Sequence, residues 1–175
     1  MITLKTTRLR LRPFVESDLK NLIELDHDLE VMKYLGGKIT PLEEIQKILP
    51  VLIERQTRWL NYGTWCADLI STGENIGWFT LKPVPTLNDE FEVGYRLKKR
   101  FWGHGYATEG SRFLVEYGFE TLKLPKIIGL TDLNNKASQN VLIKSGLERV
   151  ADIPSPFASH FIGAITAKFE MLKPN

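Results

Sequence analysis

Hydrophobic and polar residues follow two different periods along the chain, and each period predicts one kind of element. Strict alternation in RLRLRPF predicts a half-buried strand, with Leu9 and Leu11 on one face and Arg8, Arg10 and Arg12 on the other. Short apolar runs bounded by turn residues predict further strands. These runs cover residues 63–70, 75–83, 90–97, 126–132, 147–153 and 164–172.

Apolar residues at helical spacing occupy the stretches between these strands. Residues 16–35 predict two short helices, and residues 107–122 and 135–146 predict one helix each. Gly146 is the glycine expected just after the last turn of the final helix. The order of strands and helices predicts a mixed α/β sheet in a single domain of residues 1–175.

A further helical stretch, residues 40–60, carries its own start and interruption signals. Thr40 is the expected N-cap, Pro41 the first helical residue, and Glu43 the partner of Thr40 in a capping box. Pro50 lies inside the pattern and predicts a kink or a break, because proline removes a backbone hydrogen bond.

Composition narrows the function mainly by exclusion. The chain has 175 residues, a net charge of +2 and one cysteine, Cys66, so it has no disulfide framework and less charge than a general nucleic-acid binder usually carries. Its three histidines have no metal-ligand spacing. No apolar run reaches the roughly 18 residues of a membrane span, and the N-terminus lacks a signal-peptide core. We therefore expect a soluble cytoplasmic protein, without a metal and without membrane contact.

The stretch RLKKRFWGHGYATEG, residues 96–110, combines a basic strand end, two glycines around a histidine, and a helix start. This order suits an anion, because glycine lets backbone N–H groups approach closely and a helix N-terminus adds unpaired donors. A dinucleotide fingerprint needs glycine where Thr108 stands, and a nucleotide-triphosphate loop needs Lys and Ser/Thr where Ser111 and Arg112 stand. The pattern that remains is R-x-x-G-x-G, beginning at Arg100. The plainer alternative is a tight connection beside a solvated basic edge.

R-x-x-G-x-G followed by YATEG resembles the acetyl-CoA pyrophosphate loop of the GCN5-related N-acetyltransferases (GNAT). TTRLRLRPFVESDLKNL is similar to the first strand and helix of the RimJ/RimL-type branch, which acetylates protein N-termini and various small amines. FEVGYRL is similar to its fourth strand, and TDLNNKASQNVLIKSGLERV to its fifth strand, fourth helix and sixth strand. The resemblance covers most of residues 6–152. It implies a mixed, mostly antiparallel sheet flanked by helices, with acetyl-CoA in the cleft between the family's strands four and five.

The same resemblance implies where acetyl-CoA binds. The pantetheine arm would hydrogen-bond the fourth-strand backbone, and the diphosphate would take N–H groups of residues 103–107. The implied cofactor-binding residues are Tyr95, Arg96, Leu97, Arg100, Trp102, Gly103, His104, Gly105, Tyr106, Ala107, Asn135 and Ser138. Trp102 stands where many relatives have an arginine, and we expect the cations at 98–100 to supply that charge. Asn135 has a plainer alternative role as a helix cap.

The reaction requires a base for the amine and favours an acid for the leaving thiolate. Glu92 is the candidate base, because the resemblance puts it beside the expected thioester; the alternative is a solvent-facing carboxylate. Leu142 stands where many relatives have the tyrosine that acts as the acid. Leu130 stands where some relatives have a strand-five glutamate. The RimL-type resemblance makes Ser138 the candidate acid. Its alternatives are a helix serine bonded to the backbone, or a mechanism without a dedicated acid.

The acceptor is the least determined part of the prediction. Tyr34, Trp65 and Trp78 are the candidate acceptor-binding residues, with core packing as the alternative for each. The leading hypothesis is direct transfer of an acetyl group, in a ternary complex, to a protein N-terminal α-amine or a small-molecule amine. The alternatives are a catalytically weak acyl-CoA-binding sensor of the same fold and a nucleic-acid-binding module. A homodimer stays open.

Overall fold

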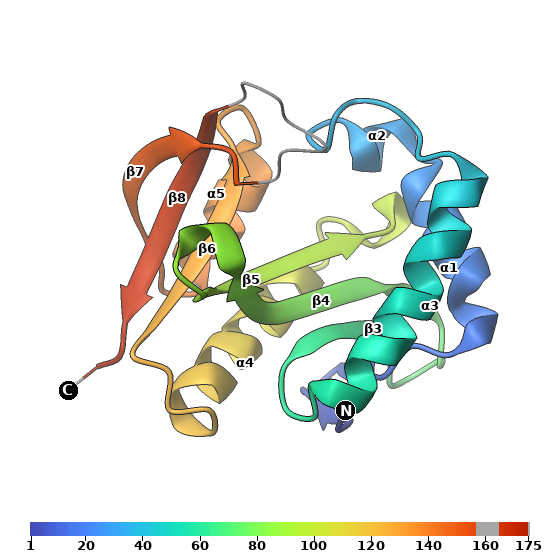
Figure 1. Ribbon diagram of the computed structural model, residues 1–175, viewed down its shortest axis with the longest axis horizontal. Helices are drawn as coiled ribbons and strands as arrows, with labels where there is room; N and C mark the ends of the chain where they lie inside the picture. The colour runs from blue at the N-terminus through green and yellow to red at the C-terminus, as the bar shows by residue number, and fades with distance from the viewer. Residues whose placement is uncertain (157–164, 175) are drawn as a thin grey trace. The chain divides into compact units, whose positions relative to one another are not determined.

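Eight strands form one mixed sheet in the computed structural model, which describes residues 1–156 and 165–174 (Figure 1). The strands are β1 (Leu4–Lys5), β2 (Leu9–Arg12), β3 (Gly63–Leu69), β4 (Asn75–Val84), β5 (Glu90–Leu97), β6 (Lys126–Asp132), β7 (Glu148–Pro154) and β8 (Ile165–Leu172). Their order in the sheet is β1-β2-β3-β4-β5-β6-β8-β7. β5 and β6 pair in parallel, whereas β1–β2, β2–β3, β6–β8 and β7–β8 are antiparallel. The predicted mixed α/β sheet is confirmed.

The helices also follow the predicted pattern: the three longest have ends within two residues of the prediction, and two short helices lie within residues 16–35. They are α1 (Leu19–Asp26), α2 (Leu29–Met32), α3 (Leu42–Arg58), α4 (Tyr106–Glu120) and α5 (Lys136–Lys144), with the 3-10 turns η1 (Glu16–Asp18), η2 (Pro85–Leu87) and η3 (Lys99–Phe101). Helix α3 continues through Pro50, so no break occurs there. The sequence pattern missed β1, because two residues are too few to establish a period.

The start of α3 differs from the prediction. Pro41 is the N-cap and no side chain caps this helix, so the predicted Thr40 cap and its capping box with Glu43 are wrong. Thr40 is instead buried at the end of α1: its N–H donates to the Asp26 carbonyl (3.1 Å), and its own carbonyl lies 3.1 Å from His27 Nε2. These contacts hold Thr40 outside the helix.

The chain divides into two compact units. Unit 1 comprises Met1–Thr80 and Tyr95–Tyr106, and unit 2 comprises Leu81–Gly94 and Ala107–Asn175. The chain passes from one unit to the other within β4, within β5 and at the start of α4. Both units contain residues that the sequence predicted for a functional site.

Unit 1 has a core of apolar side chains from α1, α3, β3 and the segment before η1. Its members are Phe14, Leu22, Ile45, Leu49 and Cys66. Ile45 and Leu49 are four residues apart and so share the inner face of α3. Burial raises the pKa of the Cys66 thiol, which keeps it protonated and unreactive. Cys66 is a buried free thiol.

Unit 2 is built on β6, β7 and β8 and on the helices α4 and α5. β6 pairs with β8 from Lys126–Leu172 to Asp132–Thr166. Helix α5 ends as predicted, since Gly146 follows its last turn with a φ of +97°. The sequence therefore predicted the residues that flank this helix, Asn135 before it and Gly146 after it.

Candidate active site

The glycine turn (residues 103–105) joins η3 to α4 and has a conformation that suits an anion. Gly103 and Gly105 have φ angles of +78° and +81°, which residues with a Cβ rarely adopt. A Cβ added at Gly103 would meet no atom within 4 Å, so there is room at this residue for a bound group. The 15-residue helix α4 begins at Tyr106, and its unpaired N-terminal N–H groups follow the turn directly. The predicted order of turn and helix start is confirmed.

Several contacts within unit 1 hold this turn. Trp102 Nε1 donates to the Leu97 carbonyl (2.8 Å), and His104 Nδ1 lies 2.8 Å from the Trp102 carbonyl. The His104 ring stacks on Tyr106, with ring centroids 5.8 Å apart. Arg8, which is 96 residues earlier than His104, donates from Nη1 to the His104 carbonyl (3.1 Å). Alternation along RLRLRPF assigned Arg8 only to a polar face and contained no signal for this contact.

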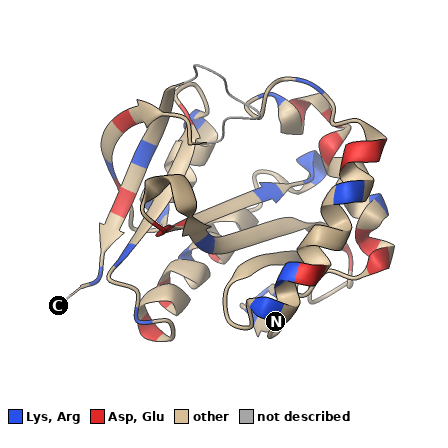
Figure 2. Cartoon of the chain, in the orientation of Figure 1, with Lys and Arg blue, Asp and Glu red and all other residues tan. Residues whose placement is uncertain are grey.

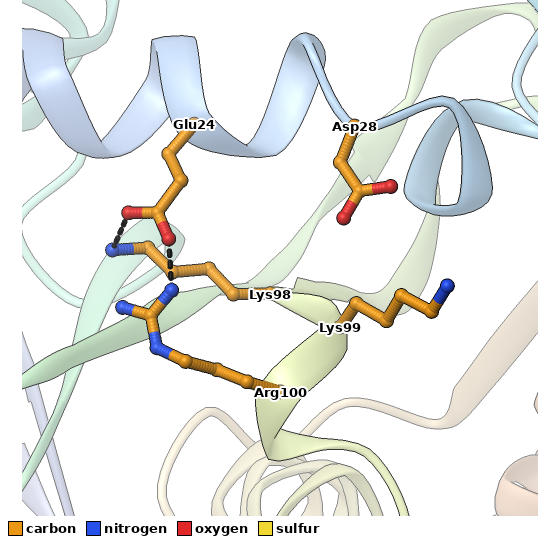
Figure 3. Close-up of a pocket in the computed structure, with 5 residues that line it drawn as sticks. All are labelled: Glu24, Asp28, Lys98, Lys99 and Arg100. Carbon is orange, nitrogen blue, oxygen red and sulfur yellow. Dashed lines mark hydrogen bonds and ion pairs between the residues drawn. The ribbon is translucent and has the colours of Figure 1, made fainter.

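The basic residues before the turn pair with carboxylates of the same unit. Lys98 Nζ lies 2.7 Å from Glu24, and the Lys98 side chain is only 4% exposed. Arg100 pairs with Glu24 (Figure 3). It also pairs with Glu74, at 3.0 Å. Partial burial opposes the shift, but hydrogen bonds from Arg100 and Lys98 outweigh it and lower the pKa of Glu24.

A small cavity lies among these charges (Figure 3). Its volume is about 330 Å³, and it is lined by Glu24, Asp28, Lys98, Lys99 and Arg100. Lys99 Nζ lies 3.8 Å from Glu30 of α2. Figure 2 shows acidic residues on the first helices, and two of them pair with the basic residues at the end of β5. The fold thus neutralises much of the charge expected for the cofactor, whose contact with these cations stays a prediction.

The C-terminal part of β5 carries the backbone predicted to bind the pantetheine arm. The Arg96 side chain pairs with Asp26, and its guanidinium lies 5.2 Å from the centre of the Trp78 ring. Arg96 Nε is buried and has no hydrogen-bond partner among the described residues. A Cβ on Gly77 would collide with the Arg96 carbonyl and stand 2.9 Å from Leu97 Cα. Only glycine lets β4 approach β5 so closely at this point.

The three aromatic residues predicted for the acceptor lie in different surroundings within unit 1. Trp65 is fully buried (0% exposed), and its Nε1 donates to the Ile2 carbonyl at 3.0 Å. Trp78 is half-buried beneath Arg96. Tyr34 is half-buried at the end of α2, with Lys33 Nζ 5.3 Å from its ring centre. Trp65 therefore matches the core alternative, whereas Trp78 and Tyr34 keep exposed surface.

Glu92, the candidate base, lies on β5 in unit 2. It pairs in register with Ile128 of β6, and β5 continues to Leu97 beyond this pair. Glu92 is only 7% exposed, so the alternative of a solvent-facing carboxylate is wrong. Burial raises the pKa of Glu92 to about 7, against the opposing effect of the Lys82 charge. A carboxyl group with such a pKa can accept and return a proton near neutral pH.

Asn135 and Ser138 lie at the start of α5, also in unit 2. Asn135 is the N-cap, and its side chain accepts from the Ser138 N–H (3.1 Å), as the capping alternative predicted. The Ser138 hydroxyl has no hydrogen-bond partner in the part of the chain that the structure describes. Ser145, at the other end of α5, donates from its hydroxyl to the Val141 carbonyl at 2.8 Å. The alternative for Ser138 was a hydroxyl that bonds to the helix backbone, and this bond is found at Ser145 instead.

Known proteins similar to this chain agree with the fold. A family model described as an acetyltransferase (GNAT) domain matches residues 8–148. The chain is 40% identical over 157 residues to the FsC-acetyl coenzyme A-N(2)-transacetylase of Aspergillus fumigatus, an alignment that covers 85% of this chain and 66% of that protein. A GNAT-family acetyltransferase from Bacillus anthracis has a TM-score of 0.82 at 22% identity, covering 98% of this chain and 99% of its own. RimL, a ribosomal L7/L12 α-N-protein acetyltransferase solved with coenzyme A, has a TM-score of 0.76 at 18% identity, covering 98% of both chains.

These findings define the class of protein as an acetyl-CoA-dependent N-acetyltransferase with acetyl-CoA as co-substrate. The chain belongs to the GNAT acetyltransferase family, and the resemblance in its sequence is confirmed. No helix of the described residues is both long and apolar enough to cross a membrane. Within the same residues, no three His, Cys, Asp or Glu side chains lie together as metal ligands would.

Proposed function

We propose that the chain transfers the acetyl group of acetyl-CoA to a primary amine by direct attack of the amine on the thioester in a ternary complex. The acceptor is a protein N-terminal α-amine or a small-molecule amine. The observation that carries the proposal is the glycine turn at the start of α4, where a Cβ added at Gly103 would meet no atom within 4 Å. The name of RimL refers to a protein α-N, and that of the Aspergillus fumigatus relative to an N(2) nitrogen; both names agree with an amine acceptor.

In this proposal the backbone of residues 103–107 binds the diphosphate, through N–H groups of the turn and of the first turn of α4. The pantetheine arm adds to β5 as a further strand would, at the backbone of Tyr95, Arg96 and Leu97. The pairing of β5 with β6 supports this placement. Glu92 of β5 pairs with Ile128 of β6, and β5 continues beyond Glu92 to Leu97. Trp102, whose indole is tied to the Leu97 carbonyl, connects the two parts.

Glu92 takes the proton from the acceptor amine, directly or through a water molecule. A protein α-amine has a pKa near 8 and a lysine-type amine a pKa near 10.4. Freeing the amine at pH 7 therefore costs roughly 1 kcal/mol for the first and roughly 5 kcal/mol for the second. A carboxylate whose pKa is raised to about 7 comes within roughly one unit of the α-amine, so the transfer between them is nearly balanced.

Ser138 gives a proton to the thiolate as it leaves. Ser138 is half-buried and its hydroxyl is not committed to the backbone of α5, which supports this role. The N-cap Asn135 fixes the first turn of α5 and so fixes the position of Ser138. Tyr34 and Trp78 are proposed to line the acceptor side.

The test of the proposed cofactor site is the substitution Gly103→Val, compared with Gly73→Val. Gly73 is a matched control: its φ is +72° against +78° at Gly103, and a Cβ would meet nothing within 4 Å at either residue. Both variants carry similar backbone strain, but only valine at 103 would occupy the space proposed for the diphosphate. Calorimetry should show acetyl-CoA binding weakened roughly tenfold or more in Gly103→Val and unchanged in Gly73→Val. Equal affinities in the two folded variants would contradict the proposal.

A second candidate function is an acyl-CoA-binding sensor of the same fold, and Leu142 favours it. This residue stands at the family's tyrosine position, is 3% exposed and packs against Gly129, so no acid exists there. A sensor would bind acetyl-CoA without releasing CoA when amines are supplied. A CoA-release assay with a panel of α-amines and small amines separates it from an enzyme.

The nucleic-acid alternative has little support in unit 1. Arg10 and Arg12 of β2 both pair with Asp68, and Arg12 also pairs with Asp18 at 2.7 Å. Their charges are therefore engaged with carboxylates of their own unit. Oligonucleotide binding that falls steeply with added salt would be needed to revive this alternative.

A further inference from the structure

Arg8 contacts the glycine turn from a distant part of unit 1. It lies just before β2, and its Nη1 donates to the His104 carbonyl at 3.1 Å. Its guanidinium carbon lies 4.5 Å from the centre of the Tyr106 ring. Its Nη2 would lie 3.5 Å from a Cβ added at Gly105. One side chain thus contacts or faces three consecutive residues of the turn and helix start.

The hydrogen bond to His104 determines where the next N–H points. The peptide between His104 and Gly105 is planar and trans, so its C=O and its N–H point in opposite directions. Because Arg8 binds the carbonyl, the Gly105 N–H is directed to the opposite side of the turn. This N–H is one of the donors proposed for the diphosphate.

Glycine makes this orientation easy to lose without an external contact. Gly105 has no Cβ, so it adopts negative φ angles about as readily as its observed +81°. A rotation of the peptide would replace the N–H with a carbonyl oxygen, which repels a phosphate. The Tyr106 ring beneath the guanidinium keeps Arg8 in place by a cation–π contact, so the bond to His104 can hold the peptide.

We propose that Arg8 is a positioning residue for acetyl-CoA, which holds the His104–Gly105 peptide so that the Gly105 N–H faces the diphosphate. This inference rests on the proposed function, since it assumes that the diphosphate binds at the glycine turn. The role differs from the one expected for the cations at 98–100, which supply charge. Arg8 acts through the backbone and not as a phosphate ligand.

The experiment compares Arg8→Met with Arg10→Met in the full chain. Methionine keeps an unbranched apolar stem of similar length and removes the guanidinium. Arg10 is a matched control, because it is an exposed arginine on the same face and its partner Asp68 keeps a second pair with Arg12. Calorimetry should show acetyl-CoA bound roughly tenfold more weakly by Arg8→Met, the order of one lost hydrogen bond to a charged group, and unchanged by Arg10→Met. Unchanged affinity in Arg8→Met would overturn the inference.

Two further readouts separate positioning from charge. In protein labelled with 15N at its 13 glycines, the Gly105 amide signal should shift when CoA binds to the wild type and should fail to shift in Arg8→Met at saturating CoA. S-acetylpantetheine lacks the diphosphate, so the kcat/KM of Arg8→Met should fall with acetyl-CoA and stay unchanged with S-acetylpantetheine. A Gly105 shift that persists in Arg8→Met would mean that Arg8 contributes only charge, which overturns the positioning role. Absence of CoA binding in the wild type would overturn the proposed function and this inference together.

Discussion

Strand β5 carries one glutamate at its N-terminal end and another in its middle, and the two have opposite surroundings. Glu90 begins the strand and pairs with Lys126 of β6 and, at 2.6 Å, with Lys168 of β8. Glu92 lies two residues further on the same face, is buried, and forms no ion pair with any described residue. The two positions lie in unit 2, so the difference comes from their immediate surroundings.

These surroundings move the two pKa values in opposite directions. Partial burial works against the shift at Glu90, but hydrogen bonds from Lys126 and Lys168 outweigh it and lower its pKa. At Glu92 burial dominates and raises the pKa to about 7. Two carboxyl groups with separated pKa values have different uses: the one with the low pKa holds strands together, and the one with the raised pKa can carry a proton.

The largest effect expected from this comparison is on catalysis in Glu92→Gln. Loss of a general base costs roughly 10²–10⁴-fold in turnover. The wild-type kcat/KM should rise with pH up to an inflection near 7, where Glu92 loses its proton, and the variant should lack this inflection. The variant should recover as pH passes the pKa of the acceptor, earlier for an α-amine than for a lysine-type amine. Acetyl-CoA affinity should not change.

The measurement is a set of pH–rate profiles for the wild type, Glu92→Gln and Glu90→Gln with one acceptor of each kind. Glu90→Gln is the control, because it removes a carboxylate from the same strand and face. Parallel profiles for the wild type and Glu92→Gln at every pH would show that Glu92 takes no proton.

The same substitution, Glu92→Gln, should increase stability at high pH although it lowers turnover. Glu92 has a raised folded pKa, so its protonated form is favoured in the native state, and stability falls as pH rises from about 4.5 to about 7. The full loss is roughly 3 kcal/mol, at about 1.36 kcal/mol per pKa unit. Urea unfolding should therefore find Glu92→Gln more stable than the wild type at pH 8 and about equal at pH 4. No gain at pH 8 would mean that the carboxylate is better solvated than its burial indicates.

Ser138→Ala should have a smaller effect and shows whether Glu92 is the only proton carrier in unit 2. Removing an acid for the thiolate should lower turnover roughly a hundredfold, at the lower edge of general acid catalysis, and leave acetyl-CoA affinity within a few-fold. Ser145→Ala is the control, since its hydroxyl bonds to Val141 and its loss should cost stability without slowing turnover. Equal turnover of wild type and Ser138→Ala across the pH range would leave Ser138 as an ordinary helix residue.

The smallest expected effect is on the stability of Glu90→Gln. Its pKa is lowered in the folded state, so its contribution is present above the unfolded value near 4.5 and is lost as pH falls through the folded pKa. Glu90→Gln should reduce stability at pH 7 by roughly 1 kcal/mol, because its ion pairs are partly exposed, and the difference should vanish in acid. Urea unfolding at pH 7 and at pH 3 measures both. A stability difference that grows in acid would contradict the pairing with Lys126 and Lys168.

Local sequence signals determined most of the fold. Alternation and helical spacing are properties of neighbouring residues, so the strands from β2 to β8 and the helices α3, α4 and α5 could be predicted to within two residues. The cap at Asn135 and the terminating Gly146 are equally local. The prediction failed at Thr40, where a contact with the end of α1 outweighed a good capping signal.

The glycine turn and the helix start after it were also determined by the sequence alone, because they are consecutive residues. Only the tertiary structure decided what surrounds them. Arg8 contacts His104, which is 96 residues later in the chain, and Glu24 of α1 pairs with Lys98 and Arg100. The pKa of Glu92 depends on how completely the fold removes water from it, and no spacing encodes that. Periodicity specifies which face a side chain occupies, whereas partners and burial depend on segments far apart in the chain that meet only when it folds.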